Sequence, residues 1–169
     1  MPNWCNNTFE VTGDAETIDK FEKFLNEKDG KNWFDFFAPT PKELEDNGWY
    51  EWNISNWGCK WNCDAQDWTR EGDTISFWFD SPWGPPTNLY EKLTEMGLQV
   101  FAEYHEEGMC FIGRYDDGYN ESYEYEYGNV DSLDDIPEEL VENWNLRDRA
   151  EEWEQDDSEF EDEDDESNS

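Results

Sequence analysis

The first thirty residues show two different hydrophobic periods. The stretch NNTFEVTG (residues 6–13) alternates between polar and apolar residues, which predicts a β-strand. The next apolar residues recur at helical spacing: Ile18, Phe21, Phe24 and Leu25. The pattern therefore predicts a helix that Asp14 caps and that ends near Asp29 and Gly30.

The later part of the chain, beyond residue 63, has equally clear periods. These periods predict, in order, a hairpin over 64–83, a helix over 84–97 and a second hairpin over 98–118. They then predict an edge strand over 119–130, whose acidic residues protect its unpaired side, and a final amphipathic helix over 132–155. The hairpins are expected to turn at Glu71-Gly72-Asp73 and at Glu106-Glu107-Gly108.

Residues 31–63 have no clean period, although Thr40 to Leu44 resembles one capped helical turn. We interpret this stretch as a long aromatic-rich loop inserted into the domain. The predicted fold is α+β: a ferredoxin-like βαββαβ antiparallel sheet with two helices on one face, the inserted loop, and extra C-terminal strands and a helix. We expect this domain over 1–127, a helical extension over 128–155 and a disordered acidic tail over 156–169.

Several blocks together carry a family resemblance. MPNWCNNTFEVTG, APTPKEL, WGCKWN, FDSPWGPP and EYHEEGMCFIGRY lie in this order between Met1 and Tyr115. In these blocks the chain resembles the YubB ferredoxin-like domain family, the Api-like proteins of phages, plasmids and prophages. The resemblance implies a ferredoxin-like sandwich and a mobile-element origin, and it implies no activity. The chain departs from the family pattern at Cys59 and in the turn around Trp83.

Composition changes the picture chiefly through charge. The sequence has 46 acidic and 11 basic residues, and residues 1–145 alone hold 33 acids and 9 bases. Because 18% of the residues are aromatic, this acidity indicates a folded domain with an acidic surface. Such a surface repels nucleic acids and anionic membranes and attracts basic proteins. A charge of −24 would match roughly 40 Å of duplex at one charge per ~1.7 Å, so DNA mimicry is one mode that we consider.

Four cysteines and one histidine are the candidates for metal chemistry. Cys59 and Cys63 have a spacing that zinc sites use, and His105 with Cys5 or Cys110 would complete four ligands. We favour structural burial of these thiols over zinc binding. A labile disulfide is the third interpretation. We expect no metal and no cofactor. The N-terminus lacks the features of a secretory signal, so we expect a cytoplasmic protein in a bacterial host, with reduced thiols.

Catalytic motifs are missing from the sequence. It contains no Gly-x-Ser-x-Gly elbow and no phosphate-binding Gly-x-x-x-x-Gly-Lys loop, and its acid pairs are those expected of a solvated surface. DDGYNES from Asp116 to Ser122 lacks the spacing of a calcium loop. We therefore predict a non-catalytic protein that binds a basic host protein and no membrane. Two modes stay open: a DNA mimic or anti-defence factor that binds a DNA-binding protein, and a regulatory or structural adaptor of another kind. The alternative is a small nucleic-acid or nucleotide-binding module that uses the aromatic loop and sheet.

The candidate binding residues are Trp57, Lys60, Trp61 and Trp83. The first three belong to WGCKWN, whose only charged residue is a base in an acidic chain. We expect this run to form a corner of the core, with Lys60 over a tryptophan ring. An exposed aromatic patch that anchors a partner is the alternative, because tryptophans are frequent at interface hot spots.

Overall fold

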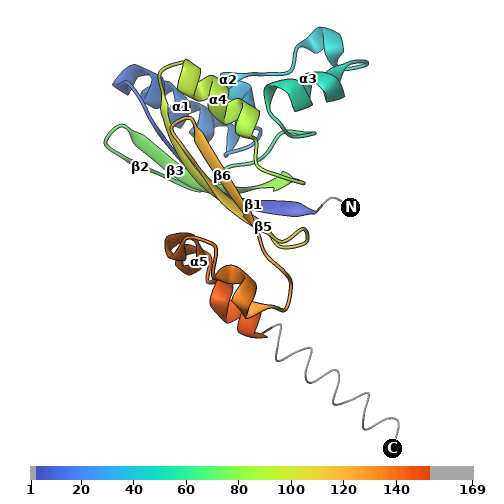
Figure 1. The fold of residues 1–169 in the computed structure, drawn as a ribbon. Helices are drawn as coiled ribbons and strands as arrows, with labels where there is room; N and C mark the ends of the chain where they lie inside the picture. Colours follow the sequence, from blue (N-terminus) through green and yellow to red (C-terminus); the bar gives the residue numbers. More distant parts are fainter. Residues whose placement is uncertain (1–2, 153–169) are drawn as a thin grey trace, which may run out of the picture.

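A six-stranded antiparallel sheet forms the centre of the molecule (Figure 1). The computed structural model describes residues 3–152. The strand order is β2-β3-β1-β4-β5-β6, so β1 lies between β3 and β4 near the middle of the sheet. The strands are β1 (Trp4–Thr12), β2 (Gln66–Glu71), β3 (Thr74–Pro82), β4 (Gln99–Glu106), β5 (Phe111–Asp116) and β6 (Tyr119–Glu124).

Helices lie on both sides of this sheet (Figure 1). The α-helices are α1 (Ala15–Lys28), α2 (Phe34–Phe37), α3 (Trp49–Asn56), α4 (Thr87–Glu95) and α5 (Glu138–Asn143), and short 3₁₀ helices are η1 (Lys42–Leu44) and η2 (Val130–Leu133). Residues 146–152 are helical as well. α1 begins where the Asp14 carboxylate accepts a hydrogen bond from the Thr17 amide at 3.0 Å, and it ends at Asp29, whose φ is 53°.

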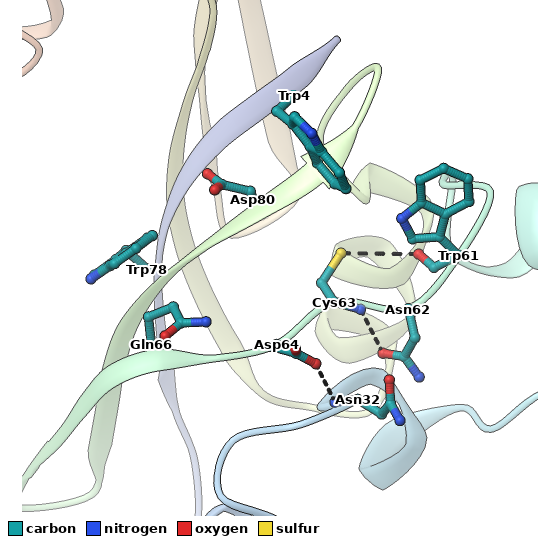
Figure 2. Close-up of a pocket in the computed structure, with 9 residues that line it drawn as sticks. All are labelled: Trp4, Asn32, Trp61, Asn62, Cys63, Asp64, Gln66, Trp78 and Asp80. Atoms are coloured by element: carbon teal, nitrogen blue, oxygen red, sulfur yellow. Dashed lines mark hydrogen bonds between the residues drawn. The ribbon is translucent and has the colours of Figure 1, made fainter. Parts of the chain in front are cut away.

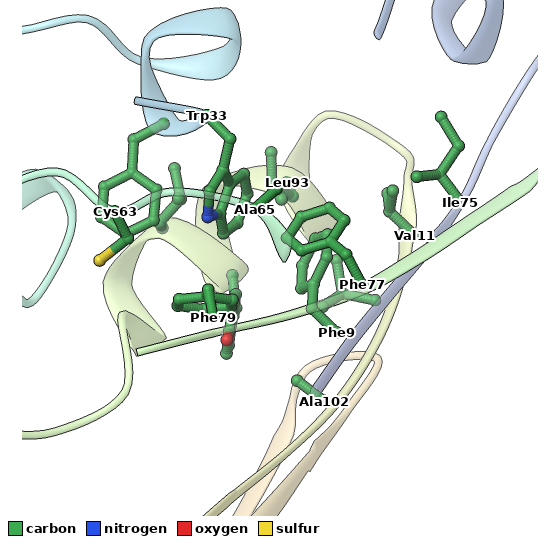
Figure 3. Close-up of a cluster of buried hydrophobic side chains, with 14 of the residues drawn as sticks. Phe9, Val11, Trp33, Cys63, Ala65, Ile75, Phe77, Phe79, Leu93 and Ala102 are labelled. Atoms are coloured by element: carbon green, nitrogen blue, oxygen red, sulfur yellow. The ribbon is translucent and has the colours of Figure 1, made fainter. Parts of the chain in front are cut away.

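An aromatic core fills the space between the sheet and the layer that contains α1 and α4. Its centre is Trp33, which packs against Phe9 of β1 and Phe77 and Phe79 of β3 with ring centroids 4.7, 5.1 and 5.2 Å apart (Figure 3). These rings are buried because successive strand residues alternate between the two faces, which places Phe9, Phe77 and Phe79 on the helix side. Tilted and edge-to-face aromatic pairs of this kind contribute about 0.5–1.5 kcal/mol each beyond their buried area.

A second, smaller core lies on the opposite face of the sheet. It joins Ile112 of β5 to Leu133, Ile136, Leu140 and Val141 of the segment that contains η2 and α5. We call η2, α5 and residues 146–152 the C-terminal layer. This layer packs below β4 and β5 in Figure 1, whereas the same face of β1 and β3 keeps an exposed row: Trp4, Asn6, Thr8, Glu10, Trp78 and Asp80. We call this uncovered half the open face.

The predicted strands, α1, α4 and both hairpins are present. Two expectations are corrected. Residues 31–63 are not irregular throughout, because they contain α2, η1 and α3. The single final helix is interrupted, because Asn145 adopts a left-handed φ of 50° and separates α5 from the helical residues 146–152. The tail expected over 156–169 lies outside the described residues.

Candidate functional site: an acidic groove on the open face

Three adjoining hollows cross the open face. The first has a volume of about 430 Å³ and shares Trp78 with the second, of about 280 Å³. The second shares Glu10 and Phe101 with the third, of about 260 Å³. We call the three together the open-face groove. It places a concave surface on the open face, and its third hollow extends to the exposed residues at the start of β4 and the end of β5.

Tryptophans form the walls of the first hollow. Trp4 and Trp78 project from β1 and β3, and Trp61 faces Trp4 from the segment before β2, with ring centroids 6.0 Å apart (Figure 2). Figure 2 shows Asp80 between Trp78 and Trp4, and Asp64 on the neighbouring segment. Trp4 and Trp78 are 47% and 44% exposed, so large apolar surfaces meet solvent beside carboxylates.

A bulge in β2 fixes the position of Trp78. The register between β2 and β3 shifts between Gln66 and Thr69, and Asp67 in the bulge has a left-handed φ of 53°. This conformation brings the Asp67 carboxylate to 2.9 Å from Nε1 of Trp78, which donates a hydrogen bond to it. β-bulges commonly redirect a side chain next to a functional surface. Here the bulge orients an exposed indole.

The wall that carries Trp61 is held to the residues after α1. The Asn62 side-chain oxygen accepts hydrogen bonds from the amides of Phe34 and Cys63, at 3.1 and 2.9 Å. Asp64 Oδ1 accepts a hydrogen bond from the Asn32 amide at 3.0 Å (Figure 2). The hollow is therefore preorganised, which lowers the entropic cost of binding.

The charge of the open-face groove has a single sign. Its ionisable carboxylates belong to two strand residues, two residues around the start of β2 and two at the end of β5: Glu10, Asp80, Asp64, Asp67, Asp116 and Asp117. No lysine or arginine lines the three hollows, and none of the ion pairs within residues 3–152 involves these six acids. The groove thus attracts cations and repels phosphates.

The four residues predicted from the sequence are divided among three places. Trp61 lines the first hollow. Lys60 and Trp83 line a different pocket of about 390 Å³, where the Lys60 ammonium lies 5.3 Å from the Trp61 ring centroid. Trp57 is only 2% exposed and donates a hydrogen bond from Nε1 to the Ala38 carbonyl at 2.8 Å. The binding assignment for Trp57 is corrected, because its ring packs in the core.

Sequence reasoning missed Trp4, Trp78, Asp64 and Asp80. The alternation of polar and apolar residues along β3 could have identified the two residues of this strand. Trp78 and Asp80 occupy the positions between the core residues of β3, so a tryptophan on the solvent side of a strand was visible in the sequence. The position of Asp64 depends on the fold around α2, which has no periodic signal.

Cys59 and Cys63 do not gather with His105 at one site. Cys59 and Cys63 are buried on the helix side, whereas His105 lies under the C-terminal layer and hydrogen-bonds Tyr125 at 2.7 Å. Burial raises the pKa of Cys59 to about 12 and raises the pKa of Cys63 well above its usual value. These thiols are therefore protonated at neutral pH. Within the described part of the chain, no group of three or more His, Cys, Asp or Glu side chains is placed to hold a metal ion.

Comparisons with known proteins connect this fold to a family. The family model described as the ferredoxin-like domain in Api92-like protein matches residues 56–145, more than half of the sequence. The chain belongs to this family. The ferredoxin-like class and the Api-like part of the resemblance are thereby confirmed. In this Api92-like protein the matched region runs from the end of α3 into the C-terminal layer and includes Trp61 and Trp78, whereas Trp4 lies before it.

One solved structure is also similar to the chain. It is the crystal structure of a protein api92 from Yersinia pseudotuberculosis, with 12% sequence identity and a TM-score of 0.48. The similarity covers 76% of this chain and 100% of that chain. The comparison with curated proteins gives no match. In residues 3–152, no helix has both the length and the apolar character that a membrane span requires.

Proposed function

We propose that this Api92-like protein is a non-catalytic binding protein whose partner is a basic protein of a bacterial host cytoplasm, engaged through the open-face groove. The observation that carries the proposal is the set of six groove carboxylates without ion pairs. Carboxylates that face solvent without a counter-charge are a source of steering and complementarity for a cationic partner.

Charge over the whole molecule supports the same proposal. Residues 3–152 contain 36 acidic and 11 basic residues, a net charge of −25. Three of the basic residues, Arg70, Arg114 and Arg147, are each paired with at least two carboxylates of the chain itself. A DNA-binding protein is the partner class that we favour, because the DNA-binding surface of such proteins is basic and binds closely spaced negative charges.

We also propose that the protein comes from a mobile element and that its core is a βαββαβ unit interrupted by the insertion over residues 31–63.

The alternative, base stacking on the sheet, has less support. Exposed tryptophans on an open sheet resemble the stacking platforms of RNA-binding modules, but those modules add basic residues for phosphates. Around Trp78 the ionisable residues that line the groove are all acidic. Phosphates would therefore be repelled where the bases would have to stack.

The test is affinity capture from bacterial lysate with the full chain, at about 50 mM and about 500 mM NaCl. The groove variant carries Asp64→Asn, Asp67→Asn and Asp80→Asn. A matched control carries Glu43→Gln, Glu45→Gln and Glu91→Gln, three exposed acids of η1, the turn after it and α4 on the helix side.

Capture of basic proteins at low salt by the wild type and by the control, with loss in the groove variant, is the expected result. Salt should weaken the capture because screening shortens the Debye length from roughly 14 Å to below 5 Å over this range. The proposal is overturned if no basic protein is captured at low salt, or if the groove variant and the control behave alike.

A further inference from the structure

The first hollow of the open-face groove combines aromatic walls with carboxylates that have unused hydrogen-bonding capacity. Asp80 Oδ1 accepts a hydrogen bond from the Asn6 side chain at 2.7 Å, and Asp64 Oδ1 accepts one from the Asn32 amide. Within the described residues, the second oxygen of each carboxylate makes no hydrogen bond or ion pair. Two acceptors therefore remain for a ligand at the edge of a tryptophan-lined hollow.

The chemistry of this hollow selects among cationic groups. A guanidinium is planar, so it stacks on an indole face while its edge donates several hydrogen bonds to carboxylates. A quaternary ammonium group donates none and would leave the Asp64 and Asp80 oxygens desolvated without a partner. A lysine ammonium holds its water strongly and cannot stack as a plane.

The same combination already holds an arginine elsewhere on this face of the sheet. The Arg114 guanidinium carbon lies 5.2 Å from the centroid of the Phe101 ring, and its Nη2 lies 2.7 Å from Glu103 Oε2. Here an aromatic ring and a carboxylate on β4 hold an arginine of β5. The first hollow presents the same kinds of groups, and no arginine or lysine lines it.

We propose that the hollow between Trp4, Trp61 and Trp78 is a recognition slot for one arginine side chain of the partner, bound by stacking on indole and by hydrogen bonds to Asp64 and Asp80. This inference rests on the proposed function and specifies its ligand. The remaining carboxylates of the groove, Glu10, Asp67, Asp116 and Asp117, then contact neighbouring basic residues of the partner.

The test uses the full ¹⁵N-labelled chain and three peptides of identical length: one with a central arginine, one with lysine and one with trimethyllysine in its place. Each has the same two flanking lysines for general charge attraction. Affinity is measured by titration, and the side-chain indole N–H signals of the tryptophans report the site. We expect the arginine peptide to bind about tenfold more tightly than the lysine peptide, which is the effect of one additional charge-assisted hydrogen bond.

Two variants probe the slot, and one matched variant controls for loss of an exposed indole. Trp61→Ala and Asp80→Asn should each reduce arginine-peptide affinity about tenfold and remove the preference over lysine. Trp83→Ala removes a tryptophan that is 53% exposed in the neighbouring pocket and should leave that preference unchanged. Unchanged backbone signals away from the site show that each variant is folded.

The outcomes separate this inference from the proposed function. Equal binding of all three peptides, weakened by the groove variant, would overturn the arginine slot and leave the basic-partner proposal standing. Tighter binding of the trimethyllysine peptide would also overturn it, because a cage for a quaternary ammonium is then the correct description. Failure of every peptide to bind at low salt would overturn both.

Discussion

His105 lies on β4 beneath the C-terminal layer, with its side chain fully buried. Its Nε2 lies 2.7 Å from the Tyr125 hydroxyl, and its Nδ1 has no hydrogen-bond partner among the described residues. Burial, with a smaller contribution from Arg149, lowers the pKa of His105 from 6.5 to about 4. The imidazole therefore remains neutral in the folded protein at pH values where it is protonated in the unfolded chain.

This difference in pKa predicts a pH dependence of stability. Between about pH 6.5 and about pH 4 the unfolded state binds a proton at His105 and the folded state does not. The free energy of unfolding therefore falls as the pH is lowered, by up to ~1.4 kcal/mol per pH unit. The expected contribution is complete above pH 6.5 and is lost as the pH approaches 4. Urea unfolding of the full chain, measured from pH 7.5 to pH 5, checks it.

The control must remove the contribution of the many carboxylates, which change protonation over the same range. We therefore compare the wild type with His105→Gln and His105→Phe, neither of which titrates. The difference in unfolding free energy between wild type and each variant should shrink as the pH falls. A difference that is constant with pH would show that His105 is not the group responsible.

Single residues also show where sequence reasoning succeeds and fails. Asp14 and Asp29 could be assigned as the caps of α1 because capping depends on local backbone geometry. The exposure of tryptophans could not be assigned in the same way: Trp57 and Trp61 are four residues apart, yet one is buried in the core and the other lines the groove. Their environments depend on contacts with distant residues, such as the Ala38 carbonyl and Trp4.

At the scale of elements, a polar network attaches the C-terminal layer to the sheet. Glu103 of β4 is only 5% exposed, and its carboxylate accepts hydrogen bonds from Arg114 of β5 and from Asn143 of α5 at 2.7 and 3.1 Å. Arg114 Nη2 also lies 3.2 Å from Glu139 of α5. The network joins three elements, and it leaves the buried carboxylate dependent on one guanidinium.

Replacement of Arg114 by methionine should therefore destabilise the protein by about 3 kcal/mol, because a buried carboxylate loses its counter-charge. The measurement is the free energy of unfolding in urea. The double variant Arg114→Met/Glu103→Gln should recover most of the loss, since no uncompensated charge remains.

Arg147→Met is the matched control for this network. Arg147 pairs with Glu138 and Asp134 at the exposed surface, and exposed pairs contribute little to stability. Equal destabilisation by Arg114→Met and Arg147→Met, or a double variant no more stable than Arg114→Met, would contradict the assignment.

The regular elements were predictable because each has a period that its own residues reveal. Alternation identified β1 and the two hairpins, and helical spacing identified α1 and α4. α2 and α3 were not predictable, because they have four and eight residues and their apolar side chains pack in several directions around Phe34 and Trp57. The sequence did not reveal that the C-terminal layer covers one half of this sheet face and leaves the other half as the open face, because this arrangement arises from tertiary packing alone.

At the scale of the whole molecule, charge repulsion opposes folding. Residues 3–152 have a net charge of −25, and the fold concentrates these charges in a smaller volume than the unfolded chain does. Added salt screens this repulsion, with a Debye length of ~30 Å at 0.01 M and ~10 Å at 0.1 M. Screening should therefore stabilise the folded state over this range.

We expect the urea midpoint of unfolding to rise between 0.01 M and 0.1 M NaCl at pH 7.5. Urea is uncharged, so it leaves the ionic strength constant during each titration. Sodium fluoride and tetramethylammonium chloride serve as controls, because screening depends on ionic strength and specific ion binding does not. A midpoint that falls with salt, or that rises with only one of these salts, would contradict the prediction.

The half-exposed indoles of the open face also give the protein an optical property. Trp4 and Trp78 emit light from among carboxylates, whereas Trp33 is fully enclosed by other rings. The charge of a collisional quencher therefore decides how efficiently it quenches these two tryptophans. The negative potential around them attracts caesium ions and repels iodide. In the unlabelled protein the contrast between the two quenchers reports the electrostatic potential at all exposed indoles, of which Trp83 and Trp49 lie outside the groove. A cationic partner that covers Trp4 and Trp78 would therefore reduce that contrast.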